Sequence, residues 1–177
     1  MKKIIFTSFF VFAFWNISNA QDSTKTIDYT PKVSSLDSIV TTLYKVVSGE
    51  KGKERDWELF KHLFLKEAKL IPTFKANDTL MQTRYLSPKD YIDNSNNWML
   101  EHGFFKKEIK RKIEGFGNIA HVFSSYYVYK SESDPTPLMR GIDSIQLFFD
   151  GTRWWIVNIY WTHETLENPI PSTYLNN

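Results

Sequence analysis

Apolar residues recur at helical spacing in three separate segments of the first hundred residues. The first segment, 36–47, follows the capping-box pattern Ser34-Ser35-Leu36-Asp37 and ends before Gly49. The second segment follows a charged loop and has its apolar stripe at Trp57, Phe60, Leu63 and Phe64. The third begins at Ser87-Pro88, where a capping serine precedes a proline in the first turn, and runs to His102-Gly103. The pattern predicts three helices.

The remaining apolar segments predict β-strands. Two short runs at 68–74 and 79–86, separated by Asn77-Asp78, indicate a hairpin between the second and third helices. Beyond residue 104 the spacing changes to the two-residue alternation of strands, which predicts long antiparallel strands at about 104–114, 119–131, 138–149 and 152–163. Helices segregated from an antiparallel sheet define an α+β domain, here assigned to 35–165.

The last two strands are expected to form a tight hairpin. Asp150-Gly151 is a two-residue turn signal, because both residue types tolerate positive φ. Side chains on one face of such a hairpin come from cross-strand pairs. The predicted pairs are Phe149 with Thr152, Leu147 with Trp154, Ile145 with Ile156, Asp143 with Asn158 and Gly141 with Tyr160.

That register places a polar pair, Asp143 and Asn158, on the apolar face that the helices would cover. The opposite face also carries many apolar side chains, among them Trp155, Ile159 and Trp161. Such a patch is typical of an interaction surface, so we expect a homodimer through the sheet. The alternative is that the N-terminal lead-in or the C-terminal tail covers this face.

Composition narrows the class of protein. The chain has 177 residues with 22 basic and 20 acidic side chains, and Lys2 and Lys3 account for the whole excess. A near-neutral domain lacks the basic face that nucleic-acid binding requires, and the lysines at 106–112 are expected to lie on a solvated strand face. The chain has no Cys, which excludes disulfides and thiolate metal sites. Four scattered His residues give no metal-ligand spacing, and no nucleotide or cofactor motif is present.

Residues 1–20 have the features of a secretory signal. Two lysines precede an apolar segment of about twelve residues, too short to span a bilayer, and Ser18-Asn19-Ala20 favours cleavage before Gln21. We therefore expect an exported protein, periplasmic or secreted, with no membrane association after cleavage; a retained anchor is the alternative. Residues 21–34 are predicted to be a flexible lead-in, and 166–177 a loose tail.

The segment from His121 to Glu164 resembles the nuclear transport factor 2-like superfamily, in particular its SnoaL-like bacterial branches. The resemblance is carried by the runs at 122–126, 140–147 and 150–157 and by Trp161, and with the helix order it covers about 36–164. It implies a cone, in which a curved sheet wraps around helices and leaves a pocket at one end, and dimerisation through the sheet. In the ketosteroid isomerase-like branch a helix tyrosine and a late-strand acid form an oxyanion hole; Tyr44 and Asp143 fall in similar places, whereas the carboxylate base has no match.

The candidate site residues follow from these patterns. A carboxylate at position 143 among apolar neighbours would have a raised pKa, which suits a general acid or a hydrogen-bond donor to a ligand. Tyr44 and His121 are its candidate catalytic partners, although the tyrosine fits its helix stripe as an ordinary core residue and a lone histidine in a strand is more often a hydrogen-bonded structural residue. The candidate ligand-binding residues are Asn158, Tyr160, Tyr126 and Trp98.

Three functions remain compatible with the sequence. The first is binding of a small apolar or amphipathic molecule in the cone, without chemistry. The second is an isomerase, dehydratase or hydrolase that uses Asp143 with Tyr44 or His121 for proton transfer. The third is a protein-interaction module that uses the outer face of the sheet. A deep cavity that contains two or more of the polar candidates would favour the enzyme.

Overall fold

The computed structural model describes residues 27–77 and 79–176. In this part of the chain six strands form one mixed sheet in the order β2-β1-β6-β5-β4-β3, in which β1 runs parallel to β6 and all other neighbours are antiparallel. The elements are α1 Thr30–Val33, α2 Leu36–Val47, α3 Trp57–His62, β1 Phe64–Lys75, β2 Met81–Thr83, α4 Pro88–His102, β3 Phe105–Phe116, β4 Ile119–Tyr129, β5 Met139–Phe149, β6 Trp154–His163 and the short 3-10 helix η1 Ser172–Tyr174.

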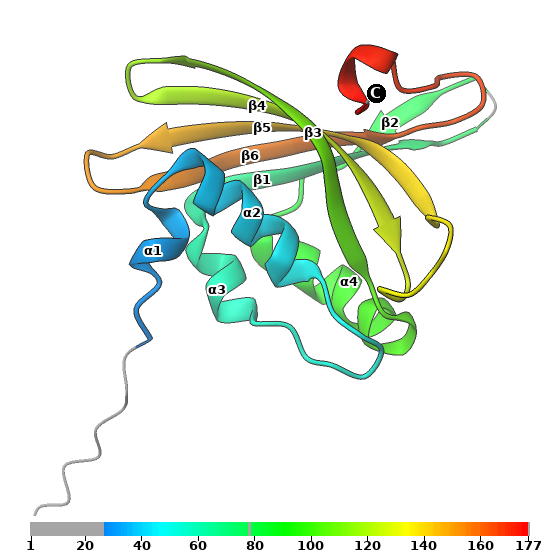
Figure 1. Ribbon diagram of the computed structural model, residues 1–177, viewed down its shortest axis with the longest axis horizontal. Helices are drawn as coiled ribbons and strands as arrows, with labels where there is room; N and C mark the ends of the chain where they lie inside the picture. The colour runs from blue at the N-terminus through cyan, green and yellow to red at the C-terminus, as the bar shows by residue number, and fades with distance from the viewer. Residues whose placement is uncertain (1–26, 78, 177) are drawn as a thin grey trace, which may run out of the picture.

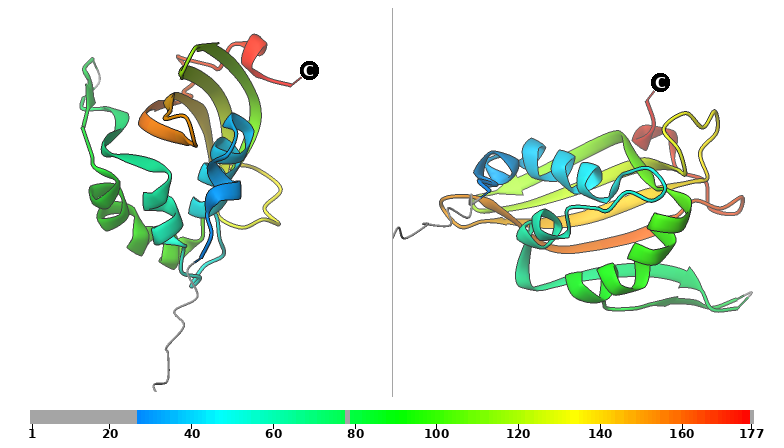
Figure 2. Two further views of the ribbon diagram at one scale, coloured as in Figure 1. Left: turned by 90° about the vertical axis from the view of Figure 1, so that its left-hand side faces the viewer. Right: turned by 90° about the horizontal axis from the view of Figure 1, so that it is seen from below.

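The sheet is strongly curved, and the helices lie in its hollow (Figures 1 and 2). Long strands β3 to β6 form the curved wall, whereas β1 and α4 close the opposite side. The predicted α+β class and the cone of helices in a curved sheet are confirmed. Among the described residues, no helix combines the length and the apolar character needed to cross a bilayer.

The predicted start of α4 is confirmed, whereas the capping box of α2 lies one residue later than the predicted Ser34–Asp37 pattern. Ser35 caps α2 by accepting the backbone N–H of Ser38, and Ser87 caps α4 by accepting that of Asp90. Gly103 ends α4 with φ of 76°, and a Cβ there would lie 2.2 Å from the carbonyl oxygen of Lys130. The second predicted helix is shorter than expected, because Phe64 already belongs to β1.

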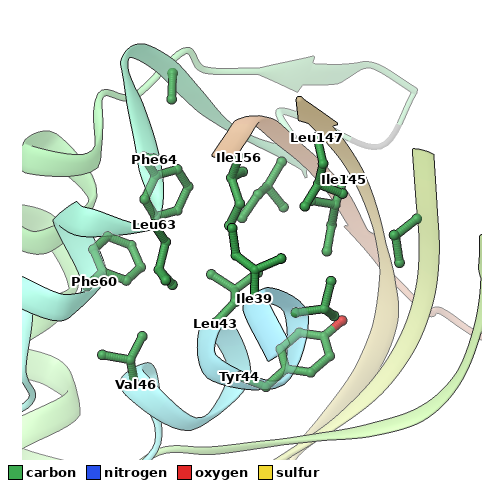
Figure 3. Packing of buried hydrophobic residues seen from close by; sticks show 14 of the residues in the cluster. Ile39, Leu43, Tyr44, Val46, Phe60, Leu63, Phe64, Ile145, Leu147 and Ile156 are labelled. Carbon is green, nitrogen blue, oxygen red and sulfur yellow. The ribbon is translucent and has the colours of Figure 1, made fainter. Parts of the chain in front are cut away.

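The hydrophobic core lies between α2 and the concave face of the sheet (Figure 3). Ile39 and Val40 of α2, Phe60 and Leu63, and Ile145 and Ile156 of the central strands are fully buried. Burial of side chains of this size contributes about 1.5–3 kcal/mol each, so this layer holds the helices in the cone. The inward positions Ile145, Leu147 and Ile156 were predicted correctly from the alternation.

The predicted register of the β5–β6 hairpin is wrong. Phe149 pairs with Trp154, and Asp143 pairs with Trp161 instead of Asn158. Two residues of this shift come from the turn, where the Asp150 carboxylate accepts the backbone N–H groups of Thr152 and Arg153 and holds a four-residue loop. The third comes from a bulge opposite the step from Gln146 to Leu147, which moves Ile159, Trp161 and His163 from the outer to the concave face.

A second bulge, in β3, changes the face of the sheet to which the following side chains point. The pairing with β4 shifts between Glu108 and Lys110, so Ile109 is the extra residue. Before the bulge Lys106 points into the cone, and beyond it Lys110 and Lys112 contact the tail on the outer face. The prediction that Lys106 lies on a solvated face with these lysines is therefore wrong.

Both ends of the described chain pack on the domain. Val33 in α1 is buried in the core, which differs from the flexible lead-in expected for 21–34; residues 21–26, like the signal expected at 1–20, lie outside the described residues. The tail folds across the outer face of the sheet, where Ser125 donates to the carbonyl oxygen of Tyr174 at 2.5 Å and the ring of Tyr174 meets Phe123 edge-on. Part of the aromatic outer face is thus covered within the same chain.

Candidate functional site

A cavity of about 280 Å³ lies in the cone, between the sheet on one side and α2 and α4 on the other. Its wall is mainly apolar with a small number of polar groups, the composition typical of small-molecule sites. The lining residues used below are Tyr44, Trp98, Lys106, Tyr126, Asp143 and His163.

Asp143 is the polar centre of this cavity and is fully buried. Its Oδ2 atom accepts hydrogen bonds from the Tyr44 hydroxyl at 3.0 Å and from the Lys106 Nζ at 2.7 Å. Its Oδ1 atom is buried and has no hydrogen-bond partner among the described residues. A buried acceptor without a partner costs about 1–3 kcal/mol, so Asp143 keeps one unused acceptor atom at the polar end of the cavity.

Three elements bring these side chains together. The inward alternation of β5 presents Asp143, and the last turns of α2 carry Tyr44 across the hollow. Lys106 comes from the start of β3, before the bulge. The segments are far apart in sequence and meet only because the sheet curves around α2.

Lys106 is held in an unusual environment for an ammonium group. Its side chain is 16% exposed, and the Nζ lies 3.7 Å from the ring centroid of Tyr126 and 5.1 Å from that of Tyr44. The loss of hydration lowers the pKa of Lys106, and the Asp143 carboxylate opposes this effect without cancelling it. The lysine is consequently closer to losing its proton than a surface lysine is.

The tyrosines of the site remain protonated donors. Burial raises the pKa of Tyr44 and of Tyr126 well above the usual range, and the negative charge of Asp143 adds to the effect. Burial in the same wall also raises the pKa of Tyr91. The phenol groups therefore serve the cavity as hydrogen-bond donors or as neutral walls, and not as bases.

The structure places four of the seven candidate residues at this cavity: Tyr44, Asp143, Tyr126 and Trp98. The other three lie on the outer face. His121 is hydrogen-bonded through Nε2 to Ser144 Oγ at 2.9 Å, Tyr160 is 48% exposed, and Asn158 pairs with the exposed Gln146. The expected contact between Asp143 and Asn158 does not form, because the turn and the bulge move the amide away.

Sequence reasoning missed Lys106 and His163. Strict alternation placed Lys106 on a solvated strand face and His163 on the face opposite Asp143. A bulge lies after Lys106 in β3 and before His163 in β6, and each bulge reverses the alternation along its strand. Neither Ile109 nor Val157 is a residue type that signals a bulge, so the sequence contains no direct indication of the two bulges.

His163, at the exposed end of β6, has a lowered pKa because it is partly desolvated and faces the Lys106 cation.

A metal site is not indicated in the part of the chain that the structure describes. No group of three or more His, Cys, Asp or Glu side chains gathers there. The carboxylate of Asp143 is instead neutralised by a lysine, which leaves a polar but uncharged cluster at the wall of an apolar cavity.

The fold has clear counterparts among solved structures. An NTF2-like protein of unknown function from Silicibacter pomeroyi matches 78% of this chain and all of its own, with 15% identity and a TM-score of 0.53. An NTF2-like protein of unknown function from Pseudomonas putida matches 76% of this chain and 89% of its own, with 9% identity and a TM-score of 0.54. A protein described as the beta subunit of an aromatic-ring-hydroxylating dioxygenase from Novosphingobium aromaticivorans matches 80% of this chain and 94% of its own, with 15% identity and a TM-score of 0.55.

Neither the scan against protein-family models nor the search of curated proteins gives a match. At identities of 9–15% the structural similarity establishes the fold and leaves the chemistry open. The predicted resemblance is confirmed at this level: the chain has the NTF2-like fold.

Proposed function

We propose that this protein binds a small, largely apolar molecule in the cone, oriented by one hydrogen-bonding group of the ligand. The observation that carries the proposal is Asp143 in the cavity wall, whose buried Oδ1 atom has no hydrogen-bond partner among the described residues. A ligand hydroxyl or amide N–H at that position would remove the cost of an unsatisfied acceptor, and the apolar wall would hold the rest of the molecule.

The charge state of the site supports a ligand that carries no net charge. Asp143 and Lys106 compensate each other at 2.7 Å, and burial disfavours an additional ion. The cavity volume of about 280 Å³ lies just below the range of about 300–1,000 Å³ found for small-molecule sites, which favours a compact ligand. Naphthol is therefore a suitable probe, since it combines a compact apolar body with one hydroxyl donor, and naphthalene is its matched analogue without the donor.

A binding titration with these two probes tests the proposal. We expect naphthol to bind more tightly than naphthalene by about 1.5–3 kcal/mol, the usual contribution of a hydrogen bond to a charged acceptor. Binding would be followed by quenching of tryptophan fluorescence, since Trp98 and Trp161 line the cavity. Equal affinities for the two probes would contradict the role of Asp143.

A pair of adjacent residues provides matched controls. Met139 lines the cavity, whereas Leu138 is 45% exposed and does not. The variant Met139→Trp should fill the cavity and abolish naphthol binding, and Leu138→Trp should leave it unchanged. Loss of binding in both variants, or in neither, would show that the probe binds elsewhere.

A proton-transfer enzyme is the second candidate function. Tyr44 and Asp143 both line the cavity and are hydrogen-bonded to each other. A cavity that contains two of the predicted polar candidates is the feature expected of an enzyme from the sequence. His121 does not share this chamber. Exchange of the α-hydrogens of tetralone in heavy water tests the idea: catalysis by the wild type that is lost in Asp143→Asn supports it, and equal rates in both argue for binding alone.

Export and self-association complete the proposal. The pattern of residues 1–20 supports secretion, and determination of the N-terminal residue of protein from its native host would test it, with Gln21 as the expected result.

A homodimer through the sheet is supported by three exposed apolar side chains on its outer side, Phe116, Ile119 and Tyr160. Light scattering of the purified protein gives the mass that decides between a monomer and a dimer.

A further inference from the structure

We propose that Lys106 is a nucleophile that captures the carbonyl group of an aldehyde or ketone in the cone as an imine. The proposal rests on the proposed ligand site and specifies its ligand class. Imine formation needs an amine that can lose its proton, an acceptor for that proton, and an apolar chamber that holds the carbonyl compound and restricts water. The structure supplies each of these at one end of the cavity.

The amine has a position suited to attack. Lys106 Nζ belongs to the cavity wall, beside Tyr126 and Asp143, and its side chain is mostly removed from solvent. The other lysines on β3 point away from this chamber: Lys107 is 44% exposed and near Glu132, and Lys110 and Lys112 contact the tail. The lowered pKa of Lys106 is in accord with this geometry, because desolvation is how proteins activate a lysine at neutral pH.

The proton acceptor is Asp143. Its Oδ2 atom lies 2.7 Å from Lys106 Nζ, within reach for transfer of one proton from the ammonium to the carboxylate. Tyr44 donates to the same oxygen and keeps the carboxylate oriented. The unpartnered Oδ1 atom is on the same carboxylate, so a hydroxyl formed next to the lysine nitrogen would have an acceptor available.

The reaction balances without a further reagent. The free amine of Lys106 forms a bond to the carbonyl carbon as the C=O π bond opens, and one N–H proton moves to the oxygen to give a carbinolamine. The carbinolamine then loses this hydroxyl with the second N–H proton as water, and a C=N bond forms. One amine and one carbonyl give one imine and one water, with no change of oxidation state.

Trapping with naphthaldehyde and sodium cyanoborohydride tests the proposal on the full-length protein. The reductant converts an imine into a stable secondary amine, and peptide mass spectrometry then locates it. At neutral pH we expect Lys106 to be modified severalfold faster than Lys107, because desolvation lowers the pKa of Lys106 and leaves a larger fraction of its amine neutral. Naphthol should suppress modification of Lys106 and leave Lys107 unaffected.

Two controls separate chemistry from accessibility. Lys106→Arg keeps a cation beside Asp143 but has no nucleophilic amine, and it should lose only the modification at position 106. The pH at which modification of Lys106 is half-maximal should lie below the ordinary pKa of a lysine, a readout that a purely structural ion pair would not give.

The outcomes distinguish this inference from the proposed function. If naphthol binds in the cone and Lys106 is modified no faster than Lys107, the imine proposal is overturned and the binding proposal stands. If naphthol does not bind and Lys106 is not modified, both are overturned. Preferential modification of Lys106 that naphthol suppresses supports both.

Discussion

Gly141 lies directly opposite Tyr126 in the ladder between β4 and β5, and the tyrosine ring occupies the space that a side chain at 141 would fill. A Cβ at 141 would lie 2.7 Å from the Tyr126 hydroxyl oxygen and 2.4 Å from the backbone oxygen of Thr162. The glycine thus allows a fully buried tyrosine to form the wall beside Lys106. The contact of the Tyr126 ring with the Lys106 ammonium therefore depends on the absence of a side chain at Gly141.

Gly141→Ala should therefore destabilise the protein by about 1–3 kcal/mol, the usual cost of overpacking a core. The measurement is urea unfolding followed by fluorescence. Gly115→Ala is the matched control, because a Cβ there meets nothing closer than 3.6 Å and its φ is ordinary. Equal losses in the two variants would refute the steric explanation.

Asp143→Asn should lower the free energy of unfolding by about 3 kcal/mol, because it leaves the Lys106 cation buried without its counter-ion. The double variant with Lys106→Met should recover part of this loss. Urea unfolding of the four proteins in the cycle gives the coupling energy, expected at about 1 kcal/mol or more for groups in contact. Additive effects would show that the ion pair does not contribute as a unit.

The pKa of His163 reports on the Lys106 cation. Partial burial and the lysine lower it below the ordinary value of 6.5, so Lys106→Met should raise it. In the wild-type protein the unfolded state therefore binds the His163 proton at a higher pH than the folded state does. Protonation of His163 consequently lowers the free energy of unfolding as the pH falls below about 6.5. An NMR titration of the His Cε1 protons checks the shift, and an unchanged value would place the cation away from this ring.

The tail should stabilise the bulged part of β3. Asn176 donates through its amide nitrogen to the carbonyl oxygen of Ile109 at 2.7 Å, and Tyr174 packs on Phe123. Tyr174→Ala should cost about 0.5–1.5 kcal/mol from the aromatic pair and increase amide exchange near residue 109. Leu166→Ala, at a 98% exposed position, is the control and should change neither quantity.

The local signals predicted the helices and the class of fold well. Capping serines at 35 and 87 and the change from helical to alternating spacing after residue 104 depend on interactions within a few residues, so they can be read from the chain. The inward face of β5, including Asp143, follows from the same alternation. Tyr44 became a candidate through the resemblance to the ketosteroid isomerase-like branch, whereas helical spacing alone placed it on the apolar stripe of α2.

The rest of the site depends on features that local patterns do not encode. The Asp150 carboxylate holds a longer turn than its residue type suggests, and bulges at Ile109 and Val157 reverse the alternation. Strict alternation therefore assigned Lys106 to the wrong face and paired Asp143 with Asn158. A lysine in a charged run gives no sign of burial until the curvature of the sheet is known.

A crystal structure of the naphthol complex tests the central claim most directly. The account predicts naphthol inside the cone, with its hydroxyl oxygen within hydrogen-bond distance of Asp143 Oδ1 and its rings between Tyr126 and the face of α4. Naphthol bound under the tail on the outer face, with no electron density for it in the cone, would contradict it.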